Sequence, residues 1–329
     1  VDLAKLIIEL ISRPVHEDVF GMDFMPMNAV KMTKRDLSEE LAVSQMNQIY
    51  DNPNSFGRTY GEHRAFLELD DQAHFEIYKY AKSLGLDFIE TLCAKGCLSL
   101  LKLFTPDRLK VASRDLTNLP LLEALAETHI PIILSTGMAG QRELDNALDV
   151  ITRYHSNIAI LHCVSQYPTH PNNLNLRTIT YLKKHYNKFE IGFSDHTIGI
   201  SAATAAVAMG AEIIEKHVTI DRHMKGTDQL GSLGPDGVNR MIRDIRIAEC
   251  WLGTEDLYIE KGLEKAMIKL ERSIATRKYI PAGSIIQESD IHLLSPGDGY
   301  KWIDKKNVIG HFAKQDISAN EIIYPDFIE

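Results

Sequence analysis

The chain lacks the features that mark secreted, membrane-spanning and nucleic-acid-binding proteins. Only four of its 329 residues are cysteine, and none makes a CxxC pair, so a zinc knuckle or a disulfide framework is not expected. No apolar run approaches the roughly 18 residues that a transmembrane helix needs. The net charge is −9, and no basic run carries interleaved aromatic residues, which argues against a nucleic-acid surface.

These absences predict a cytoplasmic protein with reduced, mostly buried thiols that binds neither nucleic acid nor a membrane. A signal peptide is not expected, because residues 1–5 already have the pattern of a helix. The chain does contain 44% hydrophobic residues. At this length it can bury the core of one barrel-sized domain and of a small second domain.

The chain also lacks a glycine-rich turn after an early strand, which would mark a doubly wound dinucleotide-binding sheet. Instead, short apolar runs alternate with helical patterns. Strands are predicted at residues 28–32, 87–91, 108–112, 131–135, 158–162, 190–194 and 213–217. Helices are predicted at residues 3–11, 37–50, 71–84, 97–104, 120–128, 141–154, 174–185, 198–209 and 238–252.

This alternation predicts an α/β protein built on a (β/α)8 TIM barrel that is one strand short. Because residues 3–11 form a helix with nothing before it, the missing strand should be the first. Short strands and tight turns dominate the last part of the chain, as in a small β-rich domain. We therefore expect a catalytic barrel at residues 1–265 and a second domain at residues 272–329. A doubly wound sheet is the alternative fold.

Polar side chains gather where the predicted strands end. They are Lys31, Thr91, Lys110, Ser113, Asp115, Ser135, His162, Ser165, Tyr167, Ser194, His196, Glu215 and His217. The carboxyl ends of barrel strands form the catalytic face, so these side chains should converge. Lysines with hydroxyl groups suit a phosphate and a carboxylate. Any one of these residues alone would more simply be a solvated or structural side chain, and the convergence is what indicates a site.

Two histidines stand out because they end neighbouring strands of one βαβ unit. His196 follows Asp195, and His217 comes two residues after Glu215. A single histidine at a strand end is more often structural than a ligand, but two in register favour a divalent-metal site. Glu215 is close enough to join them or to act as an acid or base.

Several motifs, in matching order and spacing, resemble those of the sialic acid synthases. These enzymes are the N-acetylneuraminate synthases and their legionaminate and pseudaminate relatives. The motifs lie at residues 60–64 (YGEHR), 110–113 (KVAS), 116–120 (LTNLP), 135–138 (STGM), 165–169 (SQYPT), 192–197 (GFSDHT), 215–217 (EKH) and 225–228 (KGTD). The resemblance runs through almost the whole chain.

The resemblance implies that phosphoenolpyruvate condenses with the open-chain aldehyde of an N-acylated hexosamine, usually N-acetylmannosamine. Phosphate leaves, and a nine-carbon 2-keto-3-deoxy acid forms with the help of Mn²⁺ or Mg²⁺. By motif, the metal ligands are His196 and His217, and the catalytic residues are Lys31, Lys110, Asp115 and Glu215. The substrate-binding residues are Thr91, Ser113, Ser135, Ser165, Tyr167, Ser194 and Asp228, with Tyr167 and Asp228 facing the sugar.

The last part of the chain resembles the antifreeze-like SAF domain of these synthases, which implies a domain-swapped homodimer. Four departures from the family pattern stand out. The first strand with its Glu and Asn-His-Asn-Gly signature is absent, and the stretch at residues 11–28 is longer than usual. Arg114 stands where the family usually has a glycine beside the phosphate-binding serine. Ser295 stands where the bacterial N-acetylneuraminate synthases carry an arginine. The alternatives are a related 3-deoxy sugar acid synthase for another aldose, or a catalytically weakened binding or assembly subunit.

Overall fold

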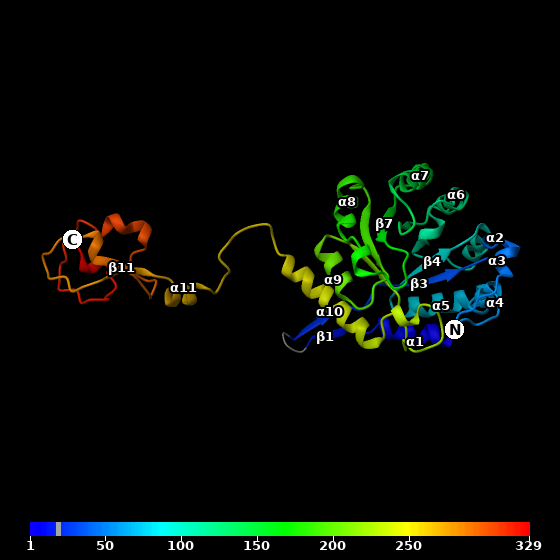
Figure 1. Ribbon diagram of the computed structural model, residues 1–329, viewed down its shortest axis with the longest axis horizontal. Coiled ribbons are helices and arrows are strands. Elements are labelled where there is room, and N and C mark those ends of the chain that lie inside the picture. Colours follow the sequence, from blue (N-terminus) through cyan, green and yellow to red (C-terminus); the bar gives the residue numbers. More distant parts are fainter. Residues whose placement is uncertain (18–20) are drawn as a thin grey trace. The chain divides into compact units, whose positions relative to one another are not determined.

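A computed structural model describes residues 1–17 and 21–329, so part of the stretch at residues 11–28 lies outside the described residues. The chain divides into two compact units, Val1–Gly253 and Thr254–Glu329. Each unit is considered by itself below. Figure 1 labels their helices and strands.

The first unit is built on a sheet of seven parallel strands in the described residues. The strands are β3 (Ala29–Lys34), β4 (Asp87–Leu92), β5 (Arg108–Val111), β6 (Ile132–Ser135), β7 (Ile158–Cys163), β8 (Glu190–Asp195) and β9 (Ile213–Lys216). Their order in the sheet is the order in the chain. A doubly wound sheet would reverse its strand order at a switch point, so that alternative is excluded.

The sheet curls until its two edge strands face each other. Strands β3 and β9 are the edges in the described residues. Lys31 Nζ on β3 nevertheless lies 3.1 Å from Glu215 Oε1 on β9, which a flat sheet of this width could not allow. The predicted α/β fold with seven parallel barrel strands is thus confirmed.

Helices cover the outer face of this curled sheet (Figure 1). They are α1 (Asp2–Ile11), α5 (Asp71–Ser83), α6 (Leu119–Ala126), α7 (Gln141–Ile151), α8 (Arg177–His185), α9 (Ser201–Ala208) and α10 (Pro235–Leu252). Helix α4 (Tyr60–Phe66) packs instead against two short helices, α2 (Leu37–Glu40) and α3 (Val43–Met46). No helix in the described residues combines the length and the apolar character needed to cross a membrane.

Side chains alternate between two cores along each strand. Outward-facing residues such as Phe88, Leu109 and Phe193 are fully buried beneath the helices. Inward-facing Ile133 and Leu161 belong to a separate small cluster inside the sheet, packed with further apolar side chains. The next inward positions toward the carboxyl ends include Thr91, Ser135 and Glu215, so the apolar layer forms the floor of the candidate site.

Several local elements differ from the sequence-based expectation, and α4 is one of them, because no helix was predicted at residues 60–66. The helix predicted at residues 37–50 is two short helices, α2 (Leu37–Glu40) and α3 (Val43–Met46), because Leu41 is extended with φ −120° and ψ 129°. Residues Lys95–Lys102 form a 3₁₀ helix, and Glu39 Oε2 accepts the Gly96 N–H at 2.9 Å near its start. The antiparallel hairpin of β1 (Val15–Glu17) and β2 (Met22–Phe24) was not predicted.

The second unit has a core of its own. It contains α11 (Glu264–Leu270) and an antiparallel pair formed by β10 (Ser273–Thr276) and β11 (Ile291–Leu294). Its core cluster consists of Ile274, Ile280, Ile286, Ile291, Val308, Ala313, Ile317, Ile323 and Ile328. This cluster is separate from the core of the first unit, as expected for a small domain that folds around its own apolar side chains.

Candidate functional site

Five strand ends bring two lysines and a glutamate together inside the curled sheet. Lys110 on β5 is buried, and its Nζ donates to Ser135 Oγ on β6 at 2.7 Å. Glu215 on β9 accepts a hydrogen bond from Ser194 Oγ on β8 at 2.8 Å. The same carboxylate lies 3.1 Å from Lys31 Nζ and 3.9 Å from Lys110 Nζ. Two cations and one anion therefore share this interior.

Burial and these ion pairs set the protonation of the cluster. Burial lowers the pKa of Lys110 to about 8, against the opposing effect of Glu215. Burial would raise the pKa of Glu215, but Lys110 and Lys31 outweigh it and hold this pKa well below its usual range. At neutral pH Glu215 is therefore an anion that can orient cations and accept hydrogen bonds, while Lys110 is mostly protonated.

Small polar side chains surround Gly137, just beyond β6. The Gly137 N–H donates to Ser113 Oγ at 3.0 Å. A Cβ atom at this position would lie 2.5 Å from Ser165 Oγ, 2.8 Å from Ser113 Oγ and 2.9 Å from Cys163 Sγ. Only glycine fits such a close approach. Two of the predicted substrate-binding hydroxyls thus meet at one point next to a backbone N–H, an arrangement suited to an anion.

Two further predicted residues lie on the same rim in different surroundings. Thr91 pairs in register with Lys110, and its buried Oγ1 has no hydrogen-bond partner among the described residues. Asp115 instead contacts Arg114, whose Nε lies 3.3 Å from Asp115 Oδ2 and whose Nη2 donates to Glu40 Oε2 at 2.7 Å. Burial raises the pKa of Asp115 and Arg114 opposes this. Thr91 is free to bind a ligand, whereas Asp115 already has a partner.

The two predicted metal-binding histidines lie side by side. Their ring centroids are 5.6 Å apart, and the rings are nearly perpendicular at 85°. His196 Nδ1 lies 2.8 Å from Val164 O, so it donates to this carbonyl, and Nε2 lies 2.9 Å from the Tyr167 hydroxyl. Burial would lower the pKa of His196, but Cys163 and the Val164 carbonyl outweigh it and raise this pKa. Burial, helped by Lys31, lowers the pKa of His217, which keeps this imidazole neutral at neutral pH.

Neutral imidazoles with an available nitrogen are the form of histidine that binds divalent metals. No group of three or more His, Cys, Asp or Glu side chains in the described part of the chain is arranged to hold a metal ion. His196 and His217 together offer two positions for a divalent cation, and water and substrate would have to fill the others.

A cavity of about 80 Å³ opens beside the histidines. It is lined by Tyr167, Pro168, Asp195, His196, His217, Thr227, Asp228, Leu230 and Gly231. Asp228 Oδ2 lies 3.8 Å from His217 Nδ1, so the predicted sugar-facing carboxylate is next to the predicted metal ligands. An aromatic ring, a hydroxyl group and a carboxylate around a small cavity suit a polar ligand.

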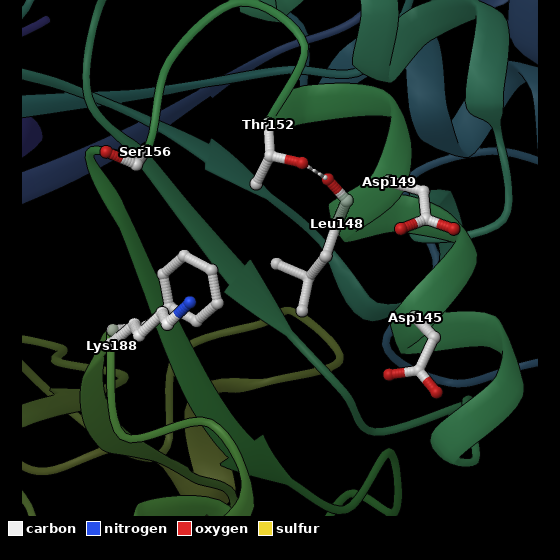
Figure 2. A pocket seen from close by; sticks show the side chains of 7 residues that line it. Asp145, Leu148, Asp149, Thr152, Ser156 and Lys188 are labelled. Carbon is white, nitrogen blue, oxygen red and sulfur yellow. Dashed lines mark hydrogen bonds between the residues drawn. The ribbon is translucent and has the colours of Figure 1, made fainter.

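A larger cavity, of about 550 Å³, lies elsewhere. Figure 2 shows Asp145 and Asp149 on α7 at one side of it and Lys188 at the other. Its other lining residues are Leu148, Thr152, Ser156 and Phe189. Ser156 and Lys188 precede β7 and β8, at the end of the sheet opposite the polar rim. Because the converging lysines and histidines lie at the other end, the smaller cavity is the better candidate site.

The sequence pattern did not reveal one feature of the rim, a buried ion pair between Asp195 and Lys216. Their side chains are 0% and 1% exposed, and Lys216 Nζ lies 2.8 Å from Asp195 Oδ2. One feature of the sequence could have pointed to this pair: each residue directly precedes one of the two histidines. Strand alternation places them on the face opposite the histidines, and only the register of β8 and β9 shows that they meet.

The chain is similar to one protein family over most of its length. The NeuB family matches residues 25–256, and the SAF domain matches residues 271–329. N,N'-diacetyllegionaminic acid synthase of Legionella pneumophila is 33% identical over 268 residues, which cover 80% of this chain and 75% of that protein. N-acetylneuraminate-9-phosphate synthase of Homo sapiens is 28% identical over 304 residues, which cover 92% and 84%.

Solved structures agree with this similarity. The N-acetylneuraminic acid (sialic acid) synthetase of Leptospira borgpetersenii, in complex with citrate, has a TM-score of 0.64 at 29% identity and covers 80% of this chain and 84% of that one. A putative spore coat polysaccharide biosynthesis protein E of Chromobacterium violaceum has a TM-score of 0.71, covers 100% and 95%, and at 23% identity supports the fold alone. From the match over residues 25–256, this chain belongs to the NeuB family, and it carries a SAF domain at residues 271–329.

Proposed function

We propose that this protein condenses phosphoenolpyruvate with the open-chain aldehyde of an N-acylated hexosamine, N-acetylmannosamine or a close relative. The products are phosphate and a nine-carbon 2-keto-3-deoxy acid. The observation that carries the proposal is the cluster of Lys31, Lys110 and Glu215, which shares one rim with the paired histidines. The similarity to legionaminic and neuraminic acid synthases supports the same reaction class.

Phosphoenolpyruvate carries several negative charges, and the rim offers what such a ligand needs. Lys31 and Lys110 neutralise its phosphate and carboxylate. The hydroxyl groups that bind it are those of Thr91, Ser113, Ser135, Ser165 and Ser194. Charge-assisted hydrogen bonds are about twice as strong as neutral ones. Glu215 holds the two lysines in place before the substrate arrives, because it pairs with both.

The sugar lies beside His196 and His217 in this proposal. These residues hold a divalent cation, Mn²⁺ or Mg²⁺, which when bound supplies a Lewis acid for the aldehyde oxygen. The Tyr167 hydroxyl and the Asp228 carboxylate, which line the same cavity, bind the sugar hydroxyl groups. Asp115, which already pairs with Arg114, orients groups at the edge of the site. The neutral form of His217 keeps its nitrogen free for the cation.

The first test is release of phosphate from phosphoenolpyruvate in the presence of a panel of sugars. The panel contains N-acetylmannosamine, its 6-phosphate, mannose and a 2,4-diacetamido sugar. We expect phosphate release with an N-acylated sugar that depends on Mn²⁺ or Mg²⁺ and stops when the metal is chelated. Turnover with unsubstituted mannose alone would instead identify a 3-deoxy sugar acid synthase for another aldose. Tight binding of metal and phosphoenolpyruvate without turnover would indicate a binding or assembly subunit.

We further propose that the SAF domain packs over the barrel of a second copy in a domain-swapped homodimer. Residues 254–270, which begin the second unit and precede the SAF domain, expose large apolar side chains, with Leu257 98%, Ile259 67% and Leu270 69% exposed. Apolar side chains gathered in one segment commonly mark an interaction surface. A second chain of this protein is a suitable partner, since most oligomers of soluble proteins are homo-oligomers.

Deleting residues 272–329 should test this arrangement. We expect a folded first unit that still binds metal and phosphoenolpyruvate, with a KM for the sugar raised about tenfold, as for one or two lost hydrogen bonds. The KM for phosphoenolpyruvate serves as the internal control. Light scattering should show a dimer for the full chain. A monomeric full chain, or a deletion with an unchanged sugar KM, would contradict the swapped dimer.

A further inference from the structure

A buried ion pair joins β8 and β9, the two strands that end directly before the histidines. Strands β8 and β9 pair in parallel register, with Ser194 opposite Glu215 and Asp195 opposite Lys216. Because successive side chains of a strand point to opposite faces, the first pair faces the site and the second faces outward. Lys216 Nζ lies 2.8 Å from Asp195 Oδ2, with both side chains almost completely buried. The two histidines follow directly after this last paired position.

The ion pair makes hydrogen bonds to the backbone of Thr197, the residue that follows His196. Asp195 Oδ1 accepts the Thr197 N–H at 2.8 Å, and Lys216 Nζ donates to Thr197 O. The pair therefore fixes both backbone polar groups of the residue that follows His196. The paired register of β8 and β9 ends at Asp195 and Lys216, so both histidines come one residue after the last paired position. The ion pair holds the strand ends together where the ladder stops.

Stability alone gives little reason for such a pair. Taking two charges out of water costs about as much as their attraction returns, and apolar pairs of similar volume are often as stable or more stable. An apolar pair, however, cannot hold the backbone of Thr197. We propose that Asp195 and Lys216 are positioning residues that hold His196 and His217 in register for one divalent cation. This inference rests on the proposed function, because it takes the histidines as the metal ligands.

Three double variants test the inference. Asp195→Leu/Lys216→Met removes the ion pair and the bonds to Thr197 but keeps the volume. Asp195→Asn/Lys216→Gln keeps hydrogen-bonding groups without charge. The control is Arg108→Met/Glu190→Leu, which removes a 2.7 Å, partly exposed ion pair between β5 and the opposite end of β8. Binding of Mn²⁺ to the metal-free protein is measured by calorimetry, and folding by thermal melting.

We expect the apolar variant to fold and to bind Mn²⁺ about tenfold or more weakly, as is typical when the groups that orient metal ligands are lost. The amide variant should keep its affinity within about threefold, and the control should match the wild type. This pattern separates positioning from a purely structural role, because a structural role would lower the melting temperature and leave the affinity of the folded protein unchanged.

Two results would overturn the inference. One is a folded apolar variant with wild-type affinity for Mn²⁺. The other is a folded amide variant that binds Mn²⁺ at least tenfold more weakly, and this second result decides the matter if the apolar variant does not fold. A wild-type protein that binds no Mn²⁺ is a different outcome, since it contradicts the metal role of the histidines in the proposed function.

Discussion

Replacing His217 or His196 with alanine is expected to abolish metal-dependent turnover, with kcat/KM falling by about a thousandfold or more. A Lewis acid at a developing oxyanion is worth several kcal/mol, and each 1.36 kcal/mol changes the rate tenfold. With one imidazole removed, a single protein ligand would remain, because the described residues offer no third His, Cys, Asp or Glu arranged with the two histidines. Loss of either imidazole should therefore release the cation.

The fold should survive both substitutions, since the two side chains lie on the rim, above the apolar layer of the barrel interior. Mn²⁺ titration of phosphate release measures the effect, and thermal melting checks the fold. The matched control is His185→Ala, at the exposed end of α8, where the ring stacks on Tyr181. It should change neither activity nor metal affinity. Near-normal activity of both rim variants at low metal concentration would contradict the assignment.

Strand positions could be predicted closely because each strand is a short apolar run that ends in polar residues. Residues 132–135 and 158–163 are buried throughout, as in a parallel sheet covered on its outer face, and each run stands out from the polar segments around it. The polar residues at the ends of these runs could be placed on one rim from topology alone, since all strands of a barrel end on the same side. Lys110 and Glu215 meet there as the pattern requires.

Features that depend on contacts between distant segments could not be predicted. The 3₁₀ helix at Lys95–Lys102 begins where the Gly96 N–H meets Glu39, a contact absent from any local window. The ion pair between Asp195 and Lys216 depends on the exact register of two strands. A shift of one residue would move each charge to the other face. Arg114 likewise has its main partner, Glu40, 74 positions away in the chain.

Replacing Lys110 with methionine is expected to raise the KM for phosphoenolpyruvate and to lower kcat if the lysine assists the leaving phosphate. Losing a cation at a bound phosphate costs on the order of 1.5 to 3 kcal/mol, or roughly tenfold to a hundredfold in kcat/KM. The side chain is buried against Ser135, so a neutral chain of similar length should pack without a cavity. The control is Lys183→Met, which removes a surface lysine paired with Glu212.

The dependence of KM on pH makes this prediction specific to Lys110. Burial lowers the pKa of Lys110 to about 8, so the cation is present below this pH and is lost as the pH rises through it. The wild-type KM for phosphoenolpyruvate should therefore rise above about pH 8. The methionine variant has no proton to lose there, so its KM should start high and stay flat across the same window. A variant whose KM matches the wild type at pH 7 would show that Lys110 does not bind the substrate. If the two profiles rise in parallel, another group is responsible for the pH dependence.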